Sequence, residues 1–165
     1  MELYLIRHGI AAEPEDYAHD EERPLTSKGR QKTSQVAKRL RERGLRFDLI
    51  LTSPLVRARE TAIILQDTHL CSQIEEFPSL APEGDIYTWV SWLEGWQQSA
   101  AGDRCLALVG HQPDLGNWAE TLVWGKAQEK LVLKKAGIIG LDIPETNSPV
   151  SRSELFLLTS PKWLL

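Results

Sequence analysis

Two arginines and two histidines are the residues of this sequence best suited to chemistry. Arg7, His8 and Gly9 follow a short apolar run, and Arg57 and His111 each follow a later one. Guanidinium groups offer planar pairs of donors to phosphate oxygens, and a histidine can add one more donor. A neutral imidazole can also attack phosphorus to form a covalent phosphohistidine, which makes His8 a possible nucleophile. If these side chains converge, they would bind and transfer a phosphoryl group.

Each of these residues also has an ordinary structural interpretation. A single histidine at a strand end is more often solvated than nucleophilic. Arg57, on a helix with charged neighbours, would by itself belong to a solvated face, and His111 beside Pro113 would belong to a turn. Their joint placement after separate strands favours the functional interpretation. His19 and His69 lack such a setting, so we expect them at the surface.

The order of elements predicts where the polar groups meet. Short apolar runs predict strands at 2–6, 48–52, 74–77, 104–109, 131–142 and 152–159. Apolar residues at helical spacing predict helices at 27–43, 53–67, 86–96 and 114–123. Alternating strands and helices imply parallel crossovers, and the last two strands suggest an antiparallel addition. We therefore predict an α/β three-layer sandwich with a mixed, mostly parallel sheet, whose carboxyl edge gathers the polar groups.

Local signals mark the helix starts and one loop. Thr26 is expected to cap the first helix, and the Ser53 hydroxyl is expected to cap the second, with proline in its first turn. Residues 10–24 are acidic, contain two prolines and show no periodicity, so they predict a surface loop that could fold over the end of the first strand.

The bulk properties limit the class of protein. A chain of 165 residues with a net charge of −4 has the size of one globular domain, spanning 1–165. The acidic balance disfavours nucleic acid as a partner. The N-terminus lacks the basic start and long apolar run of a signal peptide or membrane span, so we expect a cytoplasmic protein without a membrane partner. Cys71 and Cys105 show neither disulfide nor metal-ligand spacing, and no metal site is predicted.

Four motifs, in order along the chain, resemble the signature of the histidine phosphatase superfamily. They are Leu5-Ile6-Arg7-His8-Gly9, Arg23-Pro24-Leu25-Thr26 with Gly29, Ser53-Pro54-Leu55-Val56-Arg57-Ala58 with Thr61, and Gly110-His111. The short chain and the segment 80–85 are most similar to the SixA-type phosphohistidine phosphatases, a compact branch without the large insertions of the mutases.

This resemblance implies a phosphoglycerate mutase-like fold and a specific reaction without a cofactor. His8 would accept the phosphoryl group, Arg7 and Arg57 would clamp its oxygens, and His111 would donate to it as charge develops. Gly9 would leave room for the close approach, and Arg23 would either reach the phosphoryl group or pair with the acidic loop. The implied substrate is a phosphorylated histidine on a partner protein, such as the phosphotransfer domain of a signalling phosphorelay, acted on by a monomeric enzyme.

The general acid that larger members of the superfamily supply has no clear equivalent here. Glu83 and Asp85 are the candidates, although Asp85 could equally cap a helix. A phosphorylated imidazole needs less help from an acid than an alkyl phosphate, so the missing acid favours phosphohistidine. A phosphatase of small phosphate esters and a catalytically silent phosphate-binding or docking module remain as alternatives. For catalysis we expect a neutral His8 and a protonated His111, with pKa values pushed apart.

Overall fold

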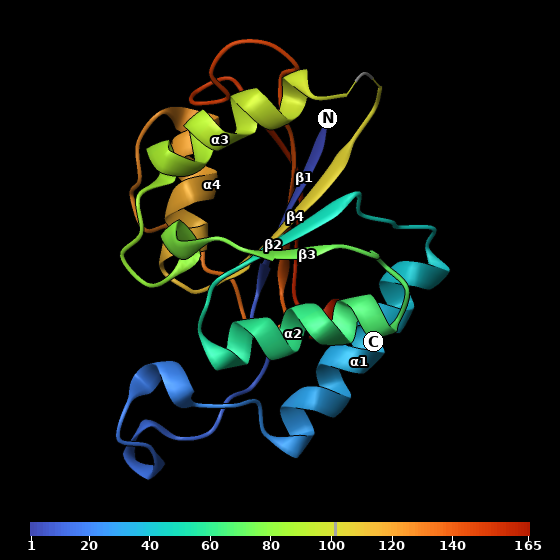
Figure 1. Cartoon of the computed structure of the whole chain (residues 1–165), viewed down its shortest axis with the longest axis vertical. Coiled ribbons are helices and arrows are strands. Elements are labelled where there is room, and N and C mark those ends of the chain that lie inside the picture. Colours follow the sequence, from blue (N-terminus) through green and yellow to red (C-terminus); the bar gives the residue numbers. More distant parts are fainter. Residues whose placement is uncertain (101) are drawn as a thin grey trace.

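The computed structural model describes residues 1–100 and 102–165 and places a six-stranded sheet at the centre of the molecule (Figure 1). The strand order is β3-β2-β4-β1-β5-β6, with β3, β2, β4 and β1 parallel and β5 antiparallel to both neighbours. The strands are β1 (Glu2–Arg7), β2 (Leu49–Thr52), β3 (Ile74–Glu76), β4 (Cys105–Gly110), β5 (Ile138–Asp142) and β6 (Glu154–Thr159).

Helices cover both faces of this sheet. They are α1 (Ser27–Glu42), α2 (Val56–Asp67), α3 (Ile86–Gln98), α4 (Asp114–Trp124) and α5 (Pro161–Leu164), with short 3-10 turns at Pro14–Asp16, Asp20–Glu22 and Pro78–Leu80. In Figure 1, α3 and α4 lie on one side of the sheet and α1 and α2 on the other. The predicted α/β sandwich with a mixed, mostly parallel sheet is therefore confirmed.

The side chains of the central strands alternate between two hydrophobic cores. Leu3 and Leu5 of β1 point to the core beneath α3 and α4, where Trp89 is fully buried. Tyr4 and Ile6 point to the opposite core beneath α1 and α2. Strands buried on both faces form a rigid platform, so the residues that follow them are held in fixed positions.

Two predicted elements differ from the structure. The helix expected from Ser53 begins only at Val56, and Ser53 lies before it outside any helix or strand. The strand expected over 131–142 is confined to Ile138–Asp142, because the preceding segment forms an irregular loop held by hydrogen bonds to α4 and β1. By contrast, the Thr26 hydroxyl caps α1 as predicted, accepting from the Gly29 N–H at 2.9 Å.

The segment between β1 and α1 folds as a loop beyond the carboxyl end of β1, at the lower left of Figure 1. Its ends are held by an isolated bridge between Ala11 and Leu25. His19 in this loop and His69 after α2 are exposed, as predicted, and Cys71 and Cys105 are free thiols. Within residues 1–100 and 102–165, no helix is long and apolar enough to cross a membrane.

Candidate active site

Three parallel strands bring the predicted groups to one edge of the sheet. In register, Arg7 of β1 lies opposite Gly110 of β4, and Thr52 of β2 lies opposite Val109. The residue after each strand continues the ladder: the N–H of His8 donates to Gly110 O at 3.0 Å, and that of Ser53 donates to Val109 O at 2.9 Å. As a result the rings of His8 and His111 lie 5.2 Å apart, centroid to centroid.

The hydrogen bonds of His8 fix its tautomer. Its Nδ1 lies 2.7 Å from the carbonyl oxygen of Gly9, which can only accept, so Nδ1 carries the proton. The unprotonated Nε2 lies 3.3 Å from Nε of Arg57, which donates to it. Burial lowers the pKa of His8 to about 3, with a further contribution from the surrounding cationic groups. At neutral pH the ring is uncharged, and its lone pair faces the arginine.

Gly9 packs closely against α1. A Cβ added there would lie 2.4 Å from Oγ1 of Thr33 on α1, a contact no side chain could keep. The Gly9 N–H donates to Oγ1 of Thr61 at 3.0 Å, and that hydroxyl donates in turn to the carbonyl oxygen of Arg57 at 2.8 Å. The chain after His8 is thereby tied to the first turn of α2.

Arg57 is buried and clamped from the outside by Asp20. Nη1 of Arg57 donates to the backbone oxygen of Asp20 at 2.8 Å, and Nη2 donates to its Oδ2 at 3.0 Å. Oδ1 of Asp20 accepts from Nε of Arg23 at 2.8 Å. Arg23 also donates to the carbonyl oxygen of Ala12, so its contacts are with the acidic loop. Although partial burial opposes it, these arginines hold the pKa of Asp20 below its usual value, so this carboxylate is not a proton donor.

Arg7 approaches from the other side of the site. Its Nη1 donates to the carbonyl oxygen of Leu133 at 2.9 Å, whereas its buried Nε has no protein partner within the described residues. Burial, followed by the charge of Arg57, lowers the pKa of Arg7. Asp20 occupies the Nη atoms of Arg57, whereas Arg7 forms no ion pair in the described chain, so its charge is available to a bound oxyanion.

His111 is paired with Ser53, a contact that the sequence did not predict. The Ser53 Oγ lies 2.8 Å from Nε2 of His111 and accepts the Leu55 N–H at 3.2 Å. A serine O–H that donates to Nε2 leaves the His111 proton on Nδ1, a buried nitrogen without a protein partner in the described chain. Burial lowers the pKa of His111 to about 4, with Arg57 contributing. The expected separation of pKa values is therefore wrong: both rings are neutral because both are buried among cations.

The two candidate acids form their hydrogen bonds with other groups. Asp85 caps α3, where its Oδ1 accepts from the Tyr87 N–H at 3.1 Å. The Glu83 N–H donates to Oδ2 of Asp114 at 2.9 Å, and burial raises the pKa of that carboxyl. In the described structure neither Glu83 nor Asp85 forms an ion pair or a side-chain hydrogen bond with either histidine or with the site arginines.

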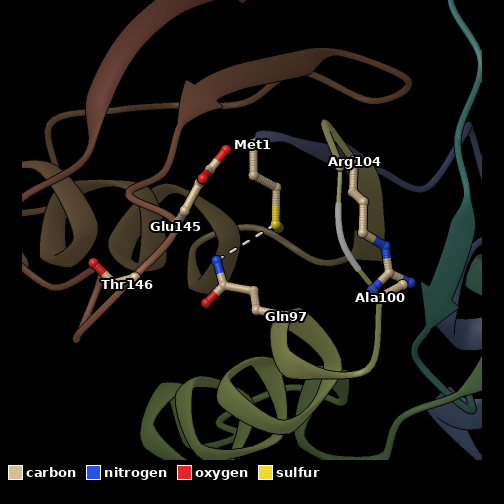
Figure 2. A pocket seen from close by; sticks show the side chains of 7 residues that line it. Met1, Gln97, Ala100, Arg104, Glu145 and Thr146 are labelled. Carbon is tan, nitrogen blue, oxygen red and sulfur yellow. Dashed lines mark hydrogen bonds between the residues drawn. The ribbon is translucent and has the colours of Figure 1, made fainter.

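A surface cavity of about 240 Å³ lies at the opposite end of the strands (Figure 2). Its lining includes Met1, before β1, and Arg104, before β4. The Arg104 guanidinium stacks 3.4 Å above the Trp96 ring and donates to the Trp96 carbonyl oxygen at 2.6 Å. Because the chemical groups follow the carboxyl ends of the same strands, this cavity is separate from them.

Sequence reasoning missed three groups that orient the site. Asp20 was one of many acids in an aperiodic loop, and nothing in its spacing separated it from the others. Ser53 was recognised as part of a motif but assigned to a helix cap. The carbonyl of Leu133 carries no side-chain signal at all. The structure thus brings together Arg7, His8, Arg57 and His111, with Arg23 one contact further out.

Comparisons with known proteins agree with this geometry. The model of the histidine phosphatase superfamily (branch 1) matches residues 3–83. An uncharacterized protein of Picosynechococcus is 54% identical over 166 residues, covering 100% of this chain and 99% of the relative. The phosphohistidine phosphatase SixA of Escherichia coli is 28% identical over 143 residues, covering 86% of each protein.

Solved structures give the same result. A structure of the protein histidine phosphatase SixA complexed with tungstate superimposes with a TM-score of 0.86 at 25% identity, covering 100% of both chains. A structure of the Shigella flexneri α-ribazole phosphatase, at 18% identity and a TM-score of 0.75, shares the fold, covering 98% of this chain and 97% of that one. The chain belongs to branch 1 of the histidine phosphatase superfamily and is a SixA-like phosphatase.

Proposed function

We propose that the protein removes the phosphoryl group from a phosphorylated histidine on a partner protein, through a phospho-His8 intermediate. The observation that carries the proposal is the state of His8: a neutral imidazole with Nδ1–H held by the Gly9 carbonyl and Nε2 left unprotonated. Such a ring is a nucleophile at neutral pH without a general base. The likeness to SixA supports the choice of substrate.

In the first step the Nε2–P bond forms as the P–N bond of the substrate breaks. A phosphoryl oxygen bound by Nε of Arg57 takes that donor away from His8 Nε2, which frees the lone pair for in-line attack. The substrate imidazole carries a proton on its second nitrogen and leaves as a neutral ring. In the second step water attacks phosphorus, and His8 leaves with the same Nδ1–H that it held at the start.

The remaining groups stabilise the charge on the equatorial oxygens. Arg7 and Arg57 supply fixed positive charge in a buried setting, where electrostatic stabilisation is strongest. His111 need not be protonated, since Ser53 leaves it with an Nδ1–H that can donate to an oxygen. A bound dianion would also raise the pKa of both histidines by opposing the charge of the arginines.

The position of the carboxylates favours phosphohistidine over an alkyl phosphate. Asp20 is held ionised by two arginines, and Asp85 is engaged as a helix cap. An alkoxide leaving group needs a proton from an acid, whereas a protonated imidazole does not. The second candidate, a phosphatase of small esters, is favoured by one observation: Asp114, whose pKa is raised by burial, lies beside Glu83.

The experiment measures phosphate release from a phosphorylated histidine-phosphotransfer domain and from a panel of small phosphate esters. Each substrate is tested with the wild type, His8→Ala, the double variant Glu83→Gln with Asp85→Asn, and His19→Ala as an exposed control. We expect release from the phosphoprotein that is lost in His8→Ala and unchanged in the other two variants.

Two outcomes would replace this assignment. Ester hydrolysis that collapses in the double variant, without turnover of the phosphoprotein, would favour the small-ester phosphatase. No His8-dependent release from any substrate would favour a silent phosphate-binding module.

A further inference from the structure

Glu120, on α4, is an acidic residue that is completely buried and has no part in the reaction as described. Its exposed fraction is 0%. No lysine or arginine forms an ion pair with it in residues 1–100 and 102–165. Burying an unpaired charge is strongly unfavourable, so the surrounding chain must satisfy this carboxylate by hydrogen bonds.

The donors are backbone N–H groups of the loop between α4 and β5. The carboxylate of Glu120 accepts from Gln128, Lys130 and Leu131, the last at 2.6 Å. Burial acts to raise the pKa of Glu120, but these backbone donors outweigh it and hold the pKa below its usual value. An ionised carboxylate ringed by N–H groups therefore fixes the path of residues 128–131.

The same loop is held from its other side by the start of α4. The carbonyl oxygen of Leu131 accepts from Nε2 of Gln112, the residue after His111, at 3.2 Å. It also faces Gly116, where an added Cβ would lie only 2.0 Å from that oxygen. The backbone of Leu131 is thus hydrogen-bonded on both sides, through its N–H to Glu120 and through its carbonyl oxygen to Gln112.

Two residues further on, this loop reaches the phosphoryl site. The carbonyl oxygen of Leu133 accepts from Nη1 of Arg7 at 2.9 Å, and it is the one hydrogen-bond partner of that guanidinium among the described residues. The N–H of Ala136 lies 3.2 Å from the carbonyl of Arg7 and 3.1 Å from that of His8. The direction of the Arg7 side chain consequently depends on where the loop places Leu133.

We propose that Glu120 is a positioning residue of the phosphoryl site, which sets the orientation of Arg7 through the loop of residues 128–133. The inference rests on the proposed function only in assuming that Arg7 binds the phosphoryl oxygens. A displacement of Arg7 by about 1 Å would weaken its contact with an oxyanion, and misplacements of that size cost up to about 100-fold in reactions.

Calorimetric titration with sodium tungstate, a tetrahedral oxyanion, tests the proposal without any phosphorylated substrate. Glu120→Gln keeps the shape of the side chain but sets an amide NH₂ against backbone donors. We expect it to weaken tungstate binding at least about tenfold and to speed amide exchange in residues 128–136. Glu129→Gln, which changes an exposed acid of the same loop, should match the wild type. If Glu120→Gln does not fold, Glu120→Asp, which retracts the charge by one methylene, replaces it.

A double-mutant cycle separates positioning from general destabilisation. In an Arg7→Ala background, Glu120→Gln should change tungstate affinity by less than about twofold, because the group it acts through is gone. An equal loss with and without Arg7, or tungstate affinity in Glu120→Gln equal to that in Glu129→Gln, would overturn the proposal. Failure of the protein to act on phosphohistidine would leave this cycle intact, so the two hypotheses fail separately.

Discussion

Acid should unfold this protein through its two buried histidines. Both have folded-state pKa values below the ordinary 6.5, about 3 for His8 and about 4 for His111, because burial disfavours the charged ring. The unfolded chain therefore binds protons at a higher pH than the folded chain, and stability falls as the pH drops below about 6.5. Each histidine then costs about 1.4 kcal/mol per pH unit, until the pH reaches its folded-state pKa.

The magnitude follows from these values. Lowering the pH from about 7.5 to about 5.5 should remove about 1.4 kcal/mol per histidine, or about 3 kcal/mol for the pair. Urea denaturation followed by circular dichroism at the two pH values measures this loss. His8→Gln and His111→Gln should each lose about half as much stability over the same interval, and the exposed control His19→Gln should lose as much as the wild type. Equal pH dependence in all four proteins would show that the buried rings are protonated in the fold, and would refute the neutral state assigned to His8 and His111.

Three further predictions follow from single contacts. Ser53→Ala should remove the hydrogen bond that selects the His111 tautomer and lower kcat/KM about tenfold, and Ser53→Thr should restore activity. An unchanged kcat/KM in Ser53→Ala would show that the serine does not orient His111. Arg57→Lys should lower kcat/KM about 100-fold or more, because a point charge cannot keep both the His8 and the outer loop contacts, and an effect on KM alone would argue against this role. Gly84→Ala should destabilise the fold by about 1–3 kcal/mol in chemical denaturation, since its Cβ would lie 1.8 Å from the Ser79 carbonyl oxygen; an unchanged midpoint would contradict the packing described.

The sequence predicted those parts of the fold that obey a local rule. Apolar runs predicted the central strands because burial on both faces requires apolar side chains, and the Thr26 cap followed from its hydroxyl before a helical run. The same rule failed at Ser53: α2 begins only at Val56, and the Ser53 hydroxyl contacts both the Leu55 N–H and His111, a residue of another element. The prediction of a strand before Ile138 failed for a related reason, because hydrogen bonds to Glu120 on a different element set the course of that loop.

The site was predictable to the extent that it is built from motif residues. Arg7 ends β1, and His8 and His111 directly follow strands. Parallel strands end at one edge, so the meeting of these residues was foreseeable. Their protonation was not, because it depends on burial by distant parts of the chain. The role of Asp20 could not be predicted either, because an ion pair between a loop and a helix produces no periodic pattern in the sequence.

The position of β1 in the sheet has a consequence for synthesis on the ribosome. Although β1 is made before the other strands, within the described chain it pairs only with β4 and β5, whose first residues are Cys105 and Ile138. At about 5–20 residues per second, roughly 5–20 s of translation separate β1 from its first partner strand. During this time the backbone of β1 has no neighbouring strand and its apolar side chains are not buried. The segment matched by the family model, 3–83, holds β1, β2 and β3 but not the strand that joins β1 to β2. A fragment cut at that boundary would leave His8, the proposed nucleophile, at the end of a strand without either of its pairing partners, and we expect it to be inactive.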